Sequence, residues 1–356
     1  MRGYLSWLQE PRKVGVAEFD VPRPAPSDLV VEVIRANVCG SDVSIWKGNH
    51  ARLKQPPLGH EFVGVVTALG SEVSTDRAGN PLAVGDRVVS TYFPVCHHCA
   101  ACARTQYGSC ERAYAYRGAP VDVAPYFHGA FASHYYIHHD QYFFKVPDRV
   151  SDAAAAGANC GIATVLEGCN RLSPVEGGIA AVIGLGGLGV SASAILALRG
   201  WRVIGVDLLP QRRETAKSFG AAEAVAESKD ARSLLGRRGA DVVIDVSGDP
   251  AAFAEAVLTV APGGTILEIG NVDQGPNLVT SLAPADLVRR SISVHGVIRY
   301  PPDRLLATLD FLAAEGNDIP FDEQCDQTFP LSAVDKALLA AEQRTCTRVA
   351  LTPADA

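Results

Sequence analysis

Short apolar runs separated by proline and glycine fill the first 155 residues and predict a mostly β structure. The runs at 30–34, 62–66 and 87–89 are bounded by turn residues and predict strands. A further strand is expected at 130–137. Prolines at positions 22, 24 and 26 precede the first run and favour an extended entry into it.

A different pattern begins at Ser151, where a serine N-cap and an acidic first turn predict the start of a helix. From Gly178 onwards, strand and helix patterns alternate at the pace of βαβ units, which predicts a parallel sheet covered by helices. The expected strands are 179–184, 201–206, 241–246, 264–269 and 291–296, and the expected helices are 189–199 and 251–258. The tail from 301 contains two amphipathic helical patterns and a strand-like run at 348–351.

Composition places the chain among globular proteins of two domains. It has 356 residues, 47% of them apolar and 20% charged. The net charge of −7 and the lack of a basic stripe argue against a nucleic-acid partner. The most apolar window, 179–198, is broken by glycine and serine, so no membrane span is expected. Nine cysteines and no signal-peptide pattern favour a reducing compartment, so a cytoplasmic location is expected.

The densest chemical signal is a group of four cysteines in a C-x2-C-x2-C-x7-C spacing. They are Cys96, Cys99, Cys102 and Cys110. Four thiolates fill a tetrahedral shell and leave no open position, which predicts a structural zinc ion in a lobe at 96–110. His97 and His98 lie inside this spacing and are expected to be spacers, because the thiols already complete the shell.

A glycine-rich turn follows the expected strand at 179–184 and opens the next helix. Its G-x-G-x-x-G motif comprises Gly184, Gly186, Gly187, Leu188 and Gly189. These glycines permit a tight turn, close approach of the backbone to a pyrophosphate, and close packing of helix on strand. The motif therefore predicts a dinucleotide site.

Asp207 ends the next expected strand, where a carboxylate would bind the ribose hydroxyls and repel a 2′-phosphate. This position favours NAD as the cofactor. Arg212 and Arg213 follow closely and leave NADP as the alternative.

A second metal site is predicted by Cys39, His60 and Cys160, which lie far apart in the chain. Two thiolates and a neutral imidazole make a three-ligand zinc site with a fourth position open to water or substrate. Taken singly, each of the three residues could instead be an ordinary buried side chain.

In this order, the motifs Cys39-Gly-Ser-Asp42, Gly59-His-Glu61, the four-cysteine lobe and the glycine turn resemble the medium-chain, zinc-dependent alcohol dehydrogenase family over nearly the whole chain. The resemblance implies an α/β protein with a mostly β, GroES-like catalytic domain and a Rossmann domain with a doubly wound parallel sheet. The implied boundaries are 1–155 for the catalytic domain, 156–297 for the cofactor domain and 298–356 for the return to the catalytic domain.

The same resemblance implies roles for individual residues. Catalytic zinc would lie on Cys39, His60 and Cys160, and Asp42 would orient the imidazole. The remaining implied residues are Ser41 for proton relay, Glu61 near the metal, Thr164 at the nicotinamide, Ile269 and Gly270 at its carboxamide, and Arg348 at the pyrophosphate. In many members a histidine continues the relay, but this chain has Ser44 there, and His50 is a possible substitute.

Residues 295–300 resemble the sorbitol dehydrogenase branch, where arginine and tyrosine border a polar substrate pocket. That branch usually has glutamate where this chain has Cys160. The aromatic residues expected either near substrate or in the core are Trp46, Phe93, Tyr126, His128 and Tyr300.

The expected activity is reversible hydride transfer between an alcohol and NAD, with two zinc ions per chain, one catalytic and one structural. The substrate would be a small primary or secondary alcohol, including a polyol or functionalised alcohol, or the matching carbonyl compound. The expected assembly is a homodimer or homotetramer. Two alternatives remain: a zinc-free NADPH-dependent reductase of C=C bonds or quinones on the same fold, and a non-enzymatic zinc-ribbon binding protein.

Overall fold

The computed structural model describes residues 1–270, 273 and 278–353, and its internal contacts divide the chain into two units. The first unit consists of Met1–Ala163, Arg299–Asn317 and Phe321–Ala356, and the second of Thr164–Ile298 and Asp318–Pro320. The chain thus leaves the first unit after residue 163 and returns to it at 299, against expected boundaries at 155/156 and 297/298. Within the described part of the chain, every helix is too short or too polar to cross a lipid bilayer.

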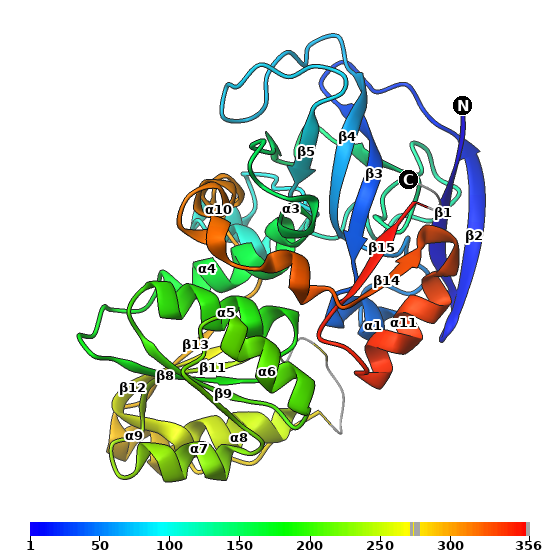
Figure 1. The fold of residues 1–356 in the computed structure, drawn as a ribbon. Coiled ribbons are helices and arrows are strands. Elements are labelled where there is room, and N and C mark those ends of the chain that lie inside the picture. Colours follow the sequence, from blue (N-terminus) through cyan, green and yellow to red (C-terminus); the bar gives the residue numbers. More distant parts are fainter. Residues whose placement is uncertain (271–272, 274–277, 354–356) are drawn as a thin grey trace. The chain divides into compact units, whose positions relative to one another are not determined.

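A seven-stranded sheet built from both parts of the chain forms the first unit. Its order is β14-β15-β3-β4-β5-β7, with β6 paired to β3. Figure 1 labels the strands from β14 to β5 in this order. The strands are β3 (Leu29–Asn37), β4 (Glu61–Leu69), β5 (Arg87–Ser90), β6 (His134–Ile137), β7 (Phe143–Lys145), β14 (Gln327–Pro330) and β15 (Val349–Thr352). β15 runs antiparallel to β3 with Ala350 opposite Asn37, so the C-terminal segment completes a sheet that the N-terminal half begins. A separate hairpin pairs β1 (Arg2–Glu10) with β2 (Lys13–Asp20).

The β3–β4 register positions the residues of interest. Val33 and Phe62 are fully buried in the core, and Asn37 at the end of β3 lies opposite Glu61 at the start of β4. Cys39 and His60, just beyond this pair, are therefore brought side by side. The helices of this unit are α1 (Gly40–Trp46), α2 (Ala100–Ala103), α3 (Asp152–Gly157), α10 (Arg304–Ala313) and α11 (Val334–Gln343).

The second unit contains a six-stranded sheet in which all pairs are parallel, in the order β10-β9-β8-β11-β12-β13. The order reverses between β8 and β11, which is the arrangement of doubly wound dinucleotide folds. Its strands are β8 (Ile179–Ile183), β9 (Arg202–Val206), β10 (Glu223–Val225), β11 (Ala240–Asp245), β12 (Val260–Glu268) and β13 (Ser293–Gly296).

Helices cover this sheet, as expected for βαβ units. They are α4 (Ala163–Cys169), α5 (Gly187–Leu198), α6 (Pro210–Ser218), α7 (Ser228–Leu235), α8 (Pro250–Thr259) and α9 (Pro284–Arg290). Figure 1 shows α5 and α6 on one face and α7, α8 and α9 on the other. The mixed α/β architecture, with a GroES-like first unit and a Rossmann-like second unit, agrees with the prediction.

One expected strand is shorter than predicted. Of the run at 130–137, only His134–Ile137 forms a strand. The first residues bond elsewhere, because Ala130 and Phe131 donate their backbone N–H groups to Gly59 and Leu58. Their apolar side chains are buried in either case, so the hydrophobic pattern could not distinguish a strand from a packed loop.

Two carboxyl groups lie side by side at the C-terminal ends of the adjacent strands β11 and β12 in the second unit. Asp245 and Glu268 are paired in register on β11 and β12, and Asp245 is fully buried. Burial, followed by the nearby Glu268 charge, raises the pKa of Asp245 to about 7. Asp245 Oδ1 accepts hydrogen bonds from the Ser247 backbone N–H at 2.9 Å and the Ser247 hydroxyl at 2.7 Å.

This pair predicts that the second unit loses stability as pH rises. The unfolded chain releases the Asp245 proton near the ordinary aspartate pKa of 3.8, whereas the folded chain keeps it to about 7. Stabilisation is therefore complete below about pH 4 and is lost between about pH 4 and 7, at about 1.4 kcal/mol per pKa unit. Replacing Glu268 with glutamine removes one charge, so urea unfolding should show a smaller loss of stability from pH 5 to pH 8.

The exposed Glu176, in the same unit, provides a matched control because it is remote from this pair in sequence and lies on the surface. Glu176→Gln should keep the pH dependence of the parent chain. An unchanged pH slope in Glu268→Gln would contradict the role given to the Glu268 charge.

Candidate functional site

Four donor groups converge on one point in the first unit. The side chains are Cys39, His60, Glu61 and Cys160, and their donor atoms all lie within 4.8 Å of one another. Cys39 is the N-cap of α1, His60 immediately precedes β4, and Cys160 lies in a π-helical segment, Ala158–Ile162. π-Helical turns often occur at functional sites, because they rotate a side chain out of the regular helical pattern.

Asp42 holds two of these donors in place. Its Oδ2 atom accepts a hydrogen bond of 3.1 Å from the backbone N–H of Cys39, and its Oδ1 atom lies 2.9 Å from Nδ1 of His60. With Nδ1 donating its proton to the carboxylate, Nε2 presents a lone pair, 3.4 Å from the Cys160 sulfur. Asp42 and His60 are almost completely buried, so water cannot compete for these bonds.

The three donors interact electrostatically, and this interaction favours a thiolate on Cys39. The hydrogen bond from Cys160 and the neighbouring His60 lower the pKa of Cys39 well below its usual value, against the effect of burial. The same bond, together with burial, raises the pKa of Cys160. Burial is the largest single effect on His60 and lowers its pKa, but the Asp42 charge and the hydrogen bonds to Asp42 and Cys39 together raise the pKa of His60. A divalent ion would displace the proton that the two thiols share.

The distances also fit zinc. With Zn–S bonds of about 2.3 Å and Zn–N bonds of about 2.05 Å, a tetrahedral site separates sulfur and nitrogen by about 3.5 Å. The Cys160 sulfur and His60 Nε2 are 3.4 Å apart. Two thiolates and one imidazole are the donor set of a catalytic zinc site that keeps a position open.

Glu61 supplies a carboxylate to the same donor cluster, and this carboxylate is paired with Arg348. The Arg348 guanidinium is hydrogen-bonded to Glu61 Oε2, and its Nη1 atom donates to Gln324 at 3.3 Å. Burial lowers the pKa of Arg348 to about 10. The structure thus gives Arg348 a partner within the first unit, and its expected contact with a pyrophosphate stays a prediction.

The four lobe cysteines gather as predicted from their spacing. Cys96, Cys99, Cys102 and Cys110 place their sulfurs within 4.8 Å of one another. The Cys96 sulfur is 3.9 Å from that of Cys102 and 3.5 Å from that of Cys110, close to the separation of about 3.8 Å in a tetrahedral zinc–thiolate site. A hydrogen bond from the Glu111 backbone is the main cause that lowers the pKa of Cys99 to about 6.

The histidines between these cysteines bond elsewhere. His98 donates from Nδ1 to the Cys96 carbonyl oxygen at 2.6 Å, and His97 Nε2 lies 3.2 Å from the Tyr142 hydroxyl. Neither belongs to the four-donor cluster of the lobe.

Steric demands explain the glycine turn of the second unit. Gly184 has a φ of +90°, and a Cβ there would lie 2.7 Å from the Ser247 Cα atom. A Cβ on Gly189 would lie 1.8 Å from the Gly184 carbonyl oxygen, so helix α5 can pack this closely only without a side chain. Gly186 is the N-cap of α5 and makes no side-chain capping bond. The amides at this helix N-terminus form an anion-binding arrangement.

Asp207 follows β9 and caps the glycine turn. Its Oδ2 atom accepts the Leu185 backbone N–H at 2.8 Å, and its Oδ1 atom accepts that of Leu209 at 2.9 Å. Arg212 Nη1 lies 3.8 Å from Oδ2, whereas Arg213 donates to the backbone carbonyls of Asp207 and Leu208. Asp207 is thereby fixed beside the turn, with one cation next to it.

The remaining predicted cofactor residues lie at three places in the second unit. Ile269 is buried, and a Cβ on Gly270 would lie 2.7 Å from the Gly248 nitrogen, so the turns after β11 and β12 pack together there. Thr164 is buried near the start of α4, four residues after Cys160. Gly187 and Leu188 form the first turn of α5.

Two residues beside the metal donors were missed by the sequence analysis as site residues. The Tyr92 ring lies 4.7 Å from that of His60, and its hydroxyl is hydrogen-bonded to Cys160. Arg117 is 4% exposed and lies 3.6 Å from Asp42 Oδ1. No motif marks either one, because each reaches the site from a loop whose path only the fold determines.

The aromatic residues considered for a substrate pocket are mainly packing residues. Trp46, Phe93, His128 and Tyr300 are at most 4% exposed, and Tyr126 stacks on Phe19 at 4.1 Å. His128 Nε2 lies 3.0 Å from Nε2 of His138. His50 accepts the backbone N–H groups of Arg52 and Leu53 at its Nδ1 atom, which gives this nitrogen a local structural partner.

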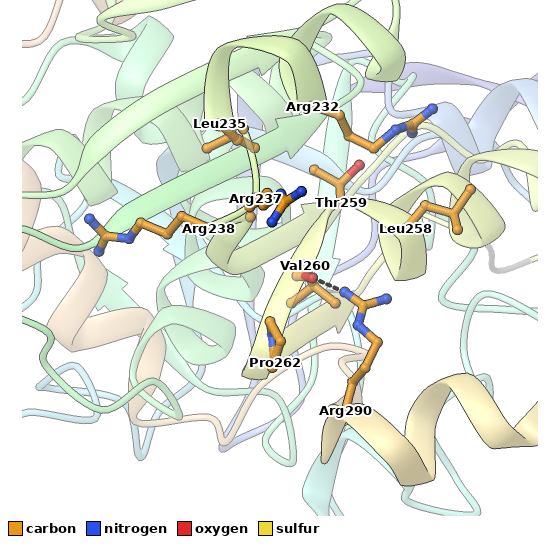
Figure 2. A pocket seen from close by; sticks show the side chains of 11 residues that line it. Arg232, Leu235, Arg237, Arg238, Leu258, Thr259, Val260, Pro262 and Arg290 are labelled. Carbon is orange, nitrogen blue, oxygen red and sulfur yellow. Dashed lines mark hydrogen bonds between the residues drawn. The ribbon is translucent and has the colours of Figure 1, made fainter.

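A cavity of about 180 Å3 lies where β11 and β12 begin, at the end of the second unit's sheet that is opposite to the glycine turn (Figure 2). Four arginines line it: Arg232, Arg237, Arg238 and Arg290. Figure 2 shows Arg238 pointing away from the other three. Arg290 donates to the Val257 and Val260 carbonyl oxygens at the end of α8. Helix C-termini favour cations, which accounts for Arg290. Arg232 and Arg238 form ion pairs with Glu255 and Asp241 at 2.5 and 2.9 Å.

Comparisons with known proteins agree with this geometry. Residues 25–148 match the family model "Alcohol dehydrogenase GroES-like domain", and residues 187–314 match "Zinc-binding dehydrogenase". The chain is 28% identical over 349 residues to 5-exo-hydroxycamphor dehydrogenase of Pseudomonas putida, covering 93% of each chain. It is 30% identical over 319 residues to a probable alcohol dehydrogenase of Mycobacterium tuberculosis, covering 86% of each. An alcohol dehydrogenase structure from Thermotoga maritima superimposes with a TM-score of 0.90 at 23% identity, covering 99% of this chain and 100% of that one.

The two donor clusters predict two zinc ions per chain. Elemental analysis of the purified protein should find two equivalents, and Cys160→Ser and Cys110→Ser should each lose one. Cys169→Ser is the matched control, because Cys169 is a buried thiol outside both clusters. A stoichiometry that Cys160→Ser does not change would contradict the site on Cys39, His60 and Cys160.

Proposed function

Because this chain belongs to the medium-chain, zinc-dependent alcohol dehydrogenase family, we propose that it transfers hydride reversibly between a primary or secondary alcohol and NAD. The observation that carries the proposal is the convergence of Cys39, His60 and Cys160 on one point, with Asp42 fixing two of them. A zinc ion held there would supply a Lewis acid for the alcohol or carbonyl oxygen.

The chain's own residues divide the remaining work. Asp42 keeps His60 in the tautomer that presents Nε2, which maintains the donor geometry during turnover. Ser41 begins the helix beside Cys39, and its hydroxyl is hydrogen-bonded to the Cys39 sulfur. We assign Ser41 the task of relaying the alcohol proton: its oxygen accepts that proton while its own hydroxyl proton passes on to the next acceptor, for which we propose the cofactor ribose. Glu61, backed by Arg348, is a carboxylate that can approach the donor cluster when ligands exchange.

NAD rather than NADP is proposed on the basis of Asp207. Its carboxylate is held at the carboxyl end of β9 by two backbone N–H groups, where it would bind ribose hydroxyls and repel a 2′-phosphate. Arg212 weakens this discrimination, because its guanidinium lies 3.8 Å from the carboxylate. Thr164, Ile269 and Gly270 are proposed to border the nicotinamide.

The two alternative functions have weaker support. A zinc-free reductase would have no use for two thiols and an imidazole gathered at one point, with sulfur and nitrogen at a zinc-like separation. A zinc-ribbon binding module would not account for the glycine turn, whose steric requirements are those of a dinucleotide site.

The relay assignment makes a kinetic prediction for Ser41→Ala. Turnover of alcohol should fall by about 10²-fold because the hydroxyl that accepts the proton is gone. Zinc content should stay at the parent value, since Ser41 is not a donor to the metal. NADH formation and elemental analysis measure the two quantities.

Ser44→Ala provides the control, because Ser44 is another serine of α1; it is buried, whereas Ser41 is partly exposed. It should retain most of the turnover. Unchanged turnover and an unchanged pH–rate profile in Ser41→Ala would show that the proton takes another route.

The cofactor assignment predicts the effect of Asp207→Asn. This change removes the charge and keeps the side-chain shape, so the ratio of kcat/KM for NAD to that for NADP should fall at least about 10-fold. Asp241→Asn is a matched control, because Asp241 also accepts a strand backbone N–H, from Ile179 at 2.8 Å, but next to the start of β11. A preference that stays the same in Asp207→Asn would argue against the ribose role.

A further inference from the structure

A single buried amide connects the chain segments that carry two of the metal donors. Asn159 is completely buried, and its Nδ2 atom donates to the carbonyl oxygens of His60 and Ser90, both at 3.0 Å. His60 is itself a predicted ligand, and Asn159 immediately precedes the ligand Cys160. One side chain thus joins the β4 and β5 segments to the π-helical segment.

The orientation of this amide is determined by its neighbours. Both groups that it faces are carbonyl oxygens, which can only accept, so the nitrogen must point toward them. The Asn159 Oδ1 atom has no hydrogen-bond partner among the residues that the structure describes. A buried amide oxygen without a hydrogen-bond partner lowers the stability of the folded chain. Such unpaired groups are rare in proteins, so a role other than stabilisation is expected for this side chain.

Asn159 is held from its other side by Tyr300. The Tyr300 hydroxyl donates to the Asn159 backbone carbonyl oxygen, and this side chain is 1% exposed. The preceding residue, Arg299, has a φ of +54° and donates to the Gly108 carbonyl oxygen in the cysteine lobe at 2.6 Å. Tyr300 is therefore placed by a strained turn that is itself tied to the lobe.

From these contacts we propose that Asn159, anchored by Tyr300, is a positioning residue that fixes the separation of His60 and Cys160. This inference rests on the proposed zinc site. The amide holds the His60 backbone, Asp42 holds its ring, and Tyr300 holds the turn that presents Cys160. The donors are thereby set before a cation binds, which lowers the conformational cost of binding.

The geometry explains why an amide is needed. Both carbonyl groups require donors, so an apolar side chain of equal size would leave them unpaired and free the two segments to separate. Displacements of about 1 Å at a catalytic group can reduce rates by about 10²-fold. Loss of residues that orient metal ligands typically costs about 10- to 100-fold in metal affinity or activity.

The test uses the full chain loaded with Co2+ in place of zinc, because the cobalt absorption spectrum reports ligand geometry. Asn159→Leu removes both donors without changing charge, and Tyr300→Phe removes only the anchoring hydroxyl. Gln141→Met is the matched control. Gln141 is also a buried bridging amide, and it donates to the Thr91 carbonyl oxygen at 2.7 Å and the Tyr135 hydroxyl at 3.2 Å.

Asn159→Leu should weaken Co2+ binding at the three-donor site by about 10- to 100-fold and alter its visible absorption, while the lobe keeps its metal. Tyr300→Phe should act in the same direction with a smaller effect. Gln141→Met should lower the melting temperature but keep Co2+ affinity within about twofold of the parent chain.

The proposal is overturned if Asn159→Leu and Tyr300→Phe both keep the parental Co2+ affinity and spectrum. Should Asn159→Leu fail to fold, Tyr300→Phe decides alone. A separate outcome concerns the zinc site itself. If Cys160→Ser binds as much Co2+ as the parent chain, the proposed zinc site is wrong. That result is distinct from failure of the positioning role, which is tested by Asn159→Leu and Tyr300→Phe.

Discussion

The Asp42 carboxylate is the constraint on which the metal-binding geometry of the first unit depends. One oxygen receives the Cys39 backbone N–H and the other receives His60 Nδ1, so a single buried group sets the position of one donor and the tautomer of another. A buried carboxylate is costly unless it is paired. Here the two hydrogen bonds, and Arg117 at 3.6 Å, compensate it.

Other buried polar groups around the site are likewise paired with a group from a distant segment. Glu61 is completely buried and is paired with Arg348, which in turn contacts Gln324. Backbone carbonyls are treated in the same way, because Asn159 supplies donors to two of them. A cluster of charges can therefore exist in the core because each is held by a group from a different segment, and this cross-linking also fixes the donors.

The two cysteine-containing sites differ in how they are built. The lobe gathers its four sulfurs within fifteen residues, so short turns suffice. The other site collects Cys39, His60 and Cys160 across more than a hundred residues and needs the β3–β4 register and the π-helical turn. In the second unit, steric fit is decisive: Gly184, Gly189 and Gly270 sit where a Cβ would meet neighbouring backbone.

The sequence by itself determined the features that are local or periodic: the alternating strands and helices of the second unit, the glycine turn and the four-cysteine lobe. Short spacings and turn chemistry carry that information within a few residues. It also indicated Cys39, His60 and Cys160 as a set, through their donor chemistry and through the resemblance of their motifs to a family. The tertiary structure alone decided that Arg348 pairs with Glu61, that Arg117 and Tyr92 approach the donors, and that Asn159 bridges them. These contacts join residues from distant segments, and no periodicity or spacing in a single chain records which loops the folded sheet brings together.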